Sequence, residues 1–209
     1  MSDLFTSPLL WVEQPLRLPA DKSDYKVLDG RGAVIAKGVE PGIGLGTQVI
    51  RAVDQILCST DRRTDVPRRL VEVRDPNDAV LLKVESHVKK SATVLSPSGD
   101  RIGSFDLPRR GLTYKRWIIN DHAGRQVGRL HSNASLRRVT VLDAYETPIA
   151  QIDKKWTGVL KEMLTTVDRY RVEIHRPLPD PLRPLVSVAA IVWDLLHFED
   201  KIWVSPLPD

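Results

Sequence analysis

A short stretch near the C-terminus decides the fold: Leu185–Leu196, with the sequence LVSVAAIVWDLL. Asp180 and Pro181 before it suit the start of a helix, and only Ser187 and Asp194 interrupt its apolar character. A helix that is apolar on every side is either buried in protein or spans a membrane. Because this run has 12 residues and a bilayer requires roughly 20, we expect the protein itself to enclose the helix.

The rest of the chain repeats one pattern: an apolar run, a turn cluster of Asp, Asn, Ser, Pro or Gly, and a second apolar run. The five copies are Val27–Ala36, Val73–Leu81, Val94–Gly103, Ile118–Gly128 and Val141–Ala150. In such turns Asp or Asn caps the backbone with its own side chain, Pro presets φ, and Gly accepts a positive φ. The pattern predicts a series of antiparallel β-hairpins.

Alternating polarity supports the strands. Tyr170, Val172 and Ile174 are apolar and their neighbours are polar, which is typical of a strand with one solvated face. Counting apolar runs gives about a dozen strands, and closing the sheet is how so many strands avoid exposed edges. We therefore predict a mainly β protein, a closed antiparallel β-barrel of about twelve strands that encloses the hydrophobic C-terminal helix. An additional amphipathic helix is expected over Thr47–Ser59.

Length and composition favour one domain. The chain has 209 residues, of which 42% are hydrophobic, and this is enough for one sizeable core. We expect a barrel domain over residues 8–203, a barrel-filling helix over residues 181–198, and short tails at residues 1–7 and 204–209. Since Cys58 is the single cysteine and no secretory signal is visible in the first residues, we expect a cytoplasmic protein.

Basic residues are unevenly distributed. The formal net charge is +4, and residues 62–116 alone hold 13 basic and 7 acidic side chains. Basic doublets recur between the hairpin turns, toward the opposite strand ends, where alternate ends of an up-and-down barrel gather into one rim. These doublets are Lys89 and Lys90, Arg109 and Arg110, Lys115 and Arg116, Arg137 and Arg138, and Lys154 and Lys155. A ring of such side chains would bind the phosphates of anionic lipid headgroups; scattered solubilising charge is the alternative.

Several segments resemble a known family. The block Asp168–Ile174, the tripeptide Asp180-Pro181-Leu182 and the run Ala189–Glu199 are similar to the end of phospholipid scramblases. The hairpin pattern and Lys155–Gly158 extend the resemblance to LURP-one-related proteins, over roughly residues 8–200. The chain is most similar to plain bacterial members without extra tails. The resemblance implies the tubby C-terminal-like fold, a twelve-stranded barrel threaded by a hydrophobic C-terminal helix, and lipid binding is known among tubby-like domains.

Two features of animal scramblases are missing from this sequence. It carries neither a Pro-rich N-terminal extension nor a cluster of cysteines for palmitoylation. The stretch that matches their proposed calcium segment, Thr166–Glu173, keeps Asp168 but adds Arg169 and Arg171. Calcium prefers six to eight oxygen ligands with several carboxylates. We therefore expect no calcium and no other cofactor.

The remaining candidate sites carry little chemistry. Gly42–Thr47 is glycine-rich but lacks the Lys-Ser/Thr of a phosphate-binding loop and the context of a dinucleotide fold. The five histidines share no metal-ligand spacing, and no nucleophile motif is present, so we expect no catalytic residue and no metal site. Asp194 lies inside the predicted plug, where we expect backbone N–H groups or an arginine to hold its carboxylate.

These observations favour a non-enzymatic protein that docks on anionic membrane surfaces, on the inner membrane face, and assists transbilayer movement of phospholipids. The alternative is a protein-interaction scaffold with no lipid role and a protein partner. Storage of a small ligand is disfavoured because the helix fills the barrel. Nucleic acid is not expected as a partner, since aromatic residues amount to only 6% of the chain.

Overall fold

The computed structural model describes residues 3–14, 24–41, 67–87, 91–107, 116–156 and 168–197. The predicted helix Thr47–Ser59 lies outside these residues. The described elements are a short 3-10 helix η1 (Asp3–Phe5), strands β1 (Leu9–Gln14), β2 (Asp24–Leu28), β3 (Val34–Val39), β4 (Pro67–Arg74), β5 (Val80–His87), β6 (Ser91–Leu95), β7 (Arg101–Asp106), β8 (Arg116–Asp121), β9 (Gln126–Ser132), β10 (Arg138–Asp143), β11 (Pro148–Trp156) and β12 (Asp168–Ile174), and helix α2 (Leu182–His197).

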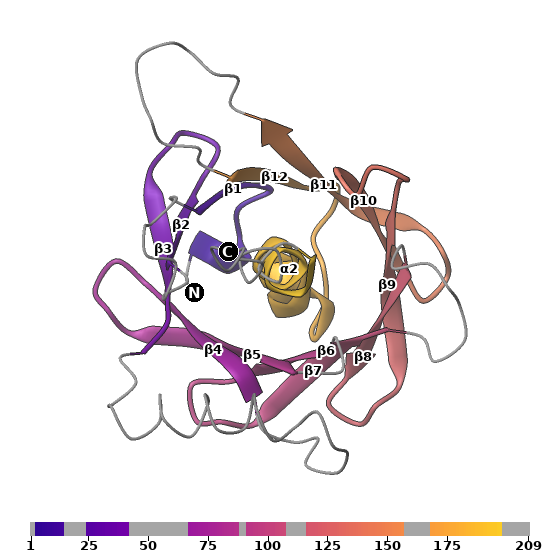
Figure 1. Cartoon of the computed structure of the whole chain (residues 1–209), viewed down its shortest axis with the longest axis horizontal. Helices are drawn as coiled ribbons and strands as arrows, with labels where there is room; N and C mark the ends of the chain where they lie inside the picture. Colours follow the sequence, from indigo (N-terminus) through magenta and orange to yellow (C-terminus); the bar gives the residue numbers. More distant parts are fainter. Residues whose placement is uncertain are drawn as a thin grey trace, which may run out of the picture.

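The twelve strands form one closed barrel (Figure 1). Each strand pairs antiparallel with its neighbour in the sequence, and β1 closes the sheet on β12 through a continuous register from Leu9 opposite Glu173 to Gln14 opposite Asp168. Closure removes the exposed strand edges that would otherwise pair with other chains. The predicted fold class is confirmed.

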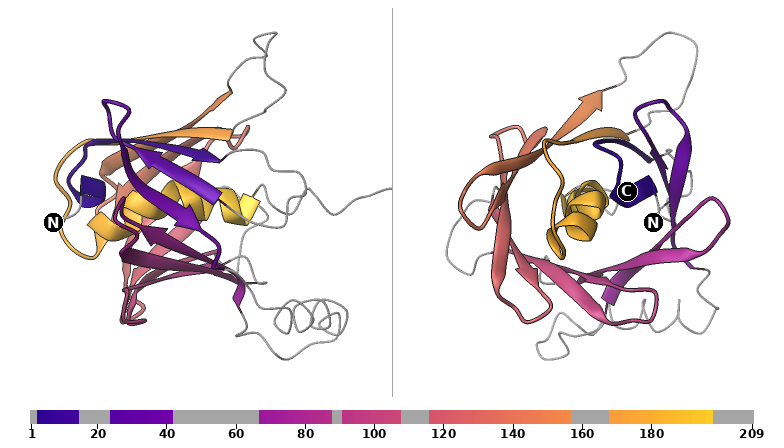
Figure 2. Two further views of the ribbon diagram at one scale, coloured as in Figure 1. Left: turned by 90° about the vertical axis from the view of Figure 1, so that its left-hand side faces the viewer. Right: turned by 180° about the vertical axis from the view of Figure 1, so that it is seen from behind.

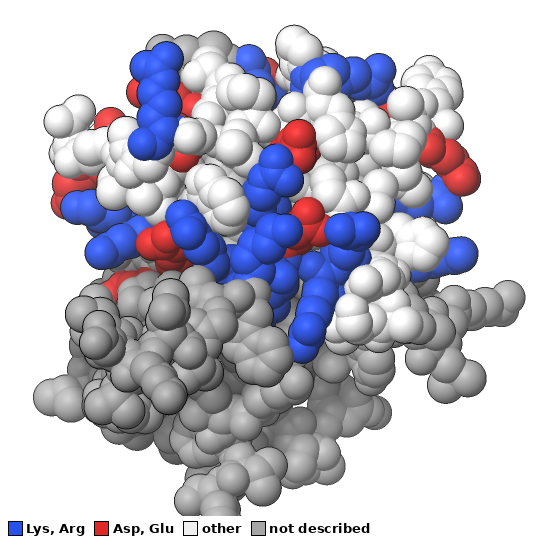
Figure 3. All heavy atoms as spheres, turned by 90° about the horizontal axis from the view of Figure 1, so that it is seen from above, with Lys and Arg blue, Asp and Glu red and all other residues white. Residues whose placement is uncertain are grey.

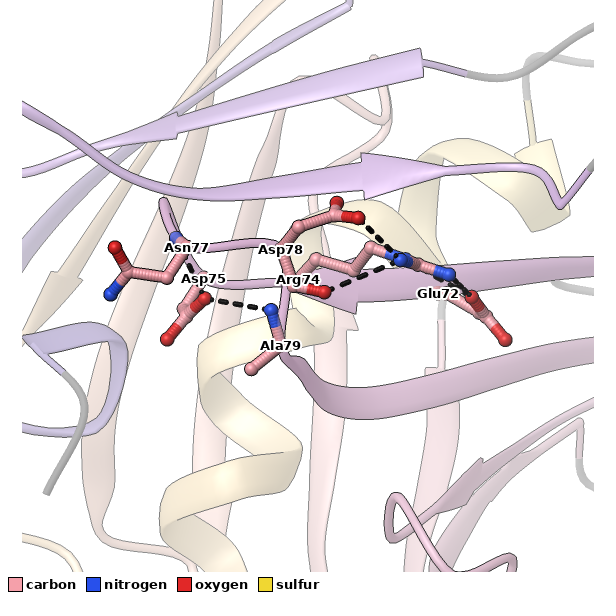
Figure 4. Close-up of polar contacts among 6 residues, drawn as sticks. All are labelled: Glu72, Arg74, Asp75, Asn77, Asp78 and Ala79. Carbon is pink, nitrogen blue, oxygen red and sulfur yellow. Dashed lines mark hydrogen bonds and ion pairs between the residues drawn. The ribbon is translucent and has the colours of Figure 1, made fainter.

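All five predicted hairpins are present, and their turns share one hydrogen-bond pattern. In the turn between β4 and β5, Oδ1 of Asp75 accepts hydrogen bonds of 2.9 Å from the backbone N–H groups of both Asn77 and Ala79 (Figure 4). The side chain thereby replaces backbone partners that a tight turn lacks. Asp29, Asp121 and Asp143 each accept the same pair of bonds in their own turns.

The fourth residue of each turn has a positive φ. It is a glycine in three hairpins, Gly32, Gly99 and Gly124, and a residue with a side chain in two, Asp78 and Glu146. Asp78 gains a partner there, because its carboxylate lies 2.9 Å from Arg74, which also pairs with Glu72 at 2.5 Å (Figure 4). Local side-chain chemistry, with an Asp in four of the turns and Ser96 in the fifth, therefore builds one end of the barrel.

Helix α2 lies lengthwise inside the barrel (Figure 2). Every residue from Leu185 to Leu196 is buried, as the sequence predicts for a plug enclosed by strands. Among the described residues no helix is both long enough and apolar enough to cross a bilayer. The inward-facing strand residues and the helix together form one continuous hydrophobic core.

The N-terminal residues also belong to this core. Residues 1–7 are expected to form a tail, but η1 packs at the start of α2, with Leu4 fully buried and its carbonyl accepting a bond of 3.3 Å from the Ser187 hydroxyl. Such a short helix has no periodicity that a sequence pattern can reveal, so the expected boundary at residue 8 leaves out a packed element.

Strand order defines two ends of the barrel. At the turn end lie the five short hairpin turns and the first residue of α2, Leu182. At the opposite end, here called the loop end, lie the other strand ends and the last helical residue, His197.

Candidate functional site

The described members of the basic doublets lie at the loop end. Arg116 begins β8, Arg137 and Arg138 lie where β10 begins, and Lys154 and Lys155 are close to the end of β11. Arg116, Arg137, Arg138 and Lys155 are exposed, and we call these four the basic rim. The other predicted residues, Lys89, Lys90, Arg109, Arg110 and Lys115, lie outside the described residues.

The doublet of Lys154 and Lys155 is divided by the barrel wall, because successive residues of a strand point to opposite faces. Lys155 is exposed on the outer face. Lys154 is opposite Tyr170 and lies on the inner face, where its Nζ is 2.7 Å from Asp168 Oδ2 and 5.2 Å from the centre of the Tyr170 ring. Lys154 therefore contributes charge to the barrel interior rather than to the basic rim.

Register brings further cations together on the outer face, namely Lys26, Lys37 and Arg169, which do not belong to the predicted doublets. Lys37 on β3 is opposite Lys26 on β2, Lys26 is opposite Glu13 on β1, and Glu13 is opposite Arg169 on β12. Arg169 is in turn opposite Lys155 on β11. The alternation of inward and outward side chains along each strand could have assigned these residues to the outer face. Only the register between strands shows that they form one row.

Figure 3 views the side of the barrel that is uppermost in Figure 1, around β1, β11 and β12. Lys and Arg side chains gather across it, with Asp and Glu between them. Three ion pairs join strands or neighbouring positions here: Arg138 with Asp153 at 3.0 Å, Arg169 with Glu13 at 3.0 Å, and Arg171 with Glu173 at 2.9 Å. Because such partly exposed pairs contribute only about 0–1 kcal/mol, phosphate groups can compete for these arginines.

A second polar group lies inside the loop end, centred on Asp194. Its side chain is fully buried, and its carboxylate accepts a hydrogen bond from the Tyr25 hydroxyl of β2 at 3.0 Å and another from the Tyr170 hydroxyl of β12. The expected partners, backbone N–H groups or an arginine, are therefore wrong. Two phenols from strands on either side of β1 replace them.

Burial raises the pKa of Asp194 to about 6. The hydrogen bond from Tyr170, the charge of Lys154 and the hydrogen bond from Tyr25 oppose this effect, whereas the charge of Asp168 adds to it. Near neutral pH the core therefore holds a carboxylate whose ionised form is disfavoured by its surroundings. We call Asp194, Tyr25, Tyr170, Lys154 and Asp168 the Asp194 centre.

Aromatic rings surround the adjacent end of the helix. His197 stacks on Trp193 with ring centres 3.8 Å apart, and it meets the edge of Trp117 from β8 at 5.4 Å. The indole N–H groups of Trp117 and Trp193 are both buried and have no hydrogen-bond partner in the described part of the chain. The helix end is thus held by aromatic contacts on one side and by the Asp194 centre on the other.

The described ranges offer no group of three His, Cys, Asp or Glu side chains arranged to hold a metal ion. Within the stretch expected to match a calcium segment, Asp168 pairs with Lys154, and Glu173 pairs with Arg171. The chemistry that the arrangement offers is electrostatic: arginine and lysine side chains that can donate charge-assisted hydrogen bonds to phosphate.

Comparisons with known proteins agree with the architecture. A sequence model of one protein family, described as Scramblase, matches residues 68–200. The X-ray structure of a protein from Arabidopsis thaliana is similar at a TM-score of 0.52 and 12% sequence identity, covering 90% of this chain and 93% of that chain. At this identity the structural similarity establishes the fold alone. No curated protein sequence matches the chain significantly.

Proposed function

Because a model of the scramblase family matches more than half of it, the chain belongs to that family, and we propose that it binds anionic membrane surfaces through the basic rim. The binding is peripheral and non-enzymatic, takes place on the cytoplasmic face of the membrane, and assists the movement of phospholipids between leaflets. Phosphate groups of the lipids accept charge-assisted hydrogen bonds from the rim arginines and lysine.

One observation carries this proposal: the exposed cations Arg116, Arg137, Arg138 and Lys155 lie at the same end of the barrel. Strands β8, β10 and β11 bring them to that end, although they are up to 39 positions apart in the sequence. A basic residue close to an anionic bilayer contributes about 1 kcal/mol to binding, so four of them are enough for reversible attachment.

Sedimentation with vesicles tests the binding. We expect the protein to sediment with vesicles that contain phosphatidylserine, to stay in solution with pure phosphatidylcholine, and to be released as salt rises. Sedimentation that is indifferent to lipid charge and to salt would contradict the proposal.

A separate assay tests transbilayer movement. Reconstituted vesicles with a fluorescent lipid in both leaflets, exposed to a membrane-impermeant quencher, lose about half of their signal if leaflets do not exchange lipid and more if they do. Binding without exchange would keep the docking and remove the scrambling from the proposed function.

A further inference from the structure

We infer that the lipid-binding surface extends from Lys155 of the basic rim over one side of the barrel, across the outer face of β3, β2, β1, β12 and β11. This inference rests on the proposed function and names the surface that meets the lipid. The docking surface, here called the cationic wall, consists of Lys26, Lys37, Lys155, Arg169 and Arg171.

The register of five neighbouring strands carries the first step. Lys37, Lys26, Glu13, Arg169 and Lys155 are successive partners, so they form one row across the sheet. With about 4.8 Å between neighbouring strands, the row is about 19 Å long. Four of its five members are cations, and all of them belong to a single side of the barrel.

The second step concerns which cations are available. Lys26, Lys37 and Lys155 are exposed, and none has an ion-pair partner among the described residues. In the basic rim, by contrast, Arg138 is engaged in an ion pair with Asp153 at 3.0 Å. Exposed lysines on one side of a barrel, without an ion-pair partner in the described ranges, provide a field that attracts a flat anionic surface.

The arginines of the wall add hydrogen-bonding geometry. The Arg169 guanidinium lies 4.2 Å from the centre of the Trp11 ring, and its Nε is 3.0 Å from Glu13 Oε1 without the alignment of a hydrogen bond. Stacking on Trp11 holds the guanidinium in place on the outer face of the barrel. Arg171, opposite Trp11 on β12, supplies a second guanidinium beside the first.

Curvature places Arg116 farthest from the wall, whereas Arg137 and Arg138 lie where β10 begins, next to β11. Arg116 belongs to β8, which is five strands away from β1 around a barrel of twelve. Wall and Arg116 therefore face nearly opposite directions. A bilayer that meets the wall lies more than a Debye length of about 8 Å from Arg116, so that side chain contributes little to docking through the wall.

Two double variants of the full chain with equal charge change distinguish the surfaces. Lys26→Gln with Lys37→Gln removes two cations that belong to the wall and not to the basic rim, and Lys83→Gln with Arg101→Gln removes two cations of β5 and β7 that belong to neither surface. We expect the wall variant to bind phosphatidylserine-containing vesicles about 30-fold more weakly, which is the product of about 5.5-fold for each lysine. The control variant should change the affinity less than about threefold, and both should keep the unfolding midpoint of the unmodified protein.

The outcomes separate the two proposals. Unmodified protein that ignores lipid charge would overturn the proposed function. Unmodified protein that binds, together with a wall variant that weakens binding no more than the control variant does, would overturn docking through the wall and leave docking through the basic rim alone.

Discussion

The two halves of α2 are held by different kinds of contact. Near the turn end the barrel strands come so close to the helix and to one another that glycine is required. A Cβ on Gly103 would lie 2.9 Å from Leu185 and 2.3 Å from the Asn120 carbonyl, and one on Gly128 would lie 2.5 Å from the Leu142 carbonyl. Near the loop end the helix instead meets hydroxyl groups, a lysine and aromatic rings around Asp194 and His197.

This difference implies a division of roles. Close packing of Leu182 and Leu185 against glycines fixes how deep the helix lies, and it does not depend on pH. The loop-end half depends on a carboxylate with a pKa of about 6, so its stability changes between about pH 4 and pH 6. The half that responds to pH is the one closer to the proposed membrane-binding residues.

The largest expected effect comes from adding a side chain at Gly103, where the strand lies against a neighbouring strand and the helix. Gly103→Ala should lower the free energy of unfolding by about 3 kcal/mol or more, because the new Cβ overlaps backbone as well as Leu185 and neither can move freely. Urea unfolding measures the loss. Gly30→Ala is the matched control: its Cβ would be 3.5 Å from Leu9, an ordinary contact, and the change should be below about 0.5 kcal/mol. Equal effects of the two substitutions would refute tight packing at the turn end.

Asp194→Asn tests the other half. A carboxyl whose pKa is raised from 3.8 to about 6 by folding makes the protein most stable below pH 4, and stability falls as the pH rises through 6. The shift corresponds to roughly 3 kcal/mol between pH 4 and pH 7. Asn stays neutral and can both accept from one tyrosine and donate to the other, so this fall should disappear in the variant.

Urea unfolding at several pH values compares Asp194→Asn with the unmodified protein. Asp143 at the turn end has a pKa shifted in the opposite direction from that of Asp194. Burial opposes ionisation there, but hydrogen bonds from the N–H groups of Thr147 and Tyr145 and the charge of Arg176 hold its pKa below the usual range. Stability from Asp143 is therefore lost as the pH falls below 4. An unchanged slope between pH 4 and 6 in Asp194→Asn would mean that Asp194 is not the group that titrates.

The turn end could be predicted from sequence because its interactions are local. Asp75 bonds to residues two and four positions ahead, and Asp recurs at this position in four of the five hairpins. The helix was equally predictable, since an apolar run too short for a bilayer has to be enclosed by protein. Residues 3–5 were missed because one turn of helix carries no periodic signal.

The loop end depends on contacts between distant positions. Tyr25 and Asp194 are 169 positions apart, and the row from Lys37 to Lys155 depends on the pairing of five strands. A described hairpin turn and β-bulge set the pairing of β2 with β3, whereas β1 pairs with β12 through closure of the barrel, and one residue of slip would reverse every face. The inward direction of Lys154 did have a signal, because it alternates in phase with the apolar Ile152.

Removing one hydroxyl from each half gives the smallest effects and the most direct comparison. Tyr25→Phe deletes a donor to a buried carboxylate and should lower the free energy of unfolding by about 2 kcal/mol at pH 7. Ser187→Ala loses hydrogen bonds to the carbonyls of Leu4 and Arg183 and should lower it by about 1 kcal/mol or less.

The pH dependence of stability separates the two variants further. Since the bond from Tyr25 lowers the pKa of Asp194, its loss should move the fall in stability to a pH above 6, while Ser187→Ala should leave the profile parallel to that of the unmodified protein. Parallel profiles for both variants would show that the two halves of the helix do not differ in their response to pH, because the hydroxyl at the loop end would then be uncoupled from the charge of Asp194.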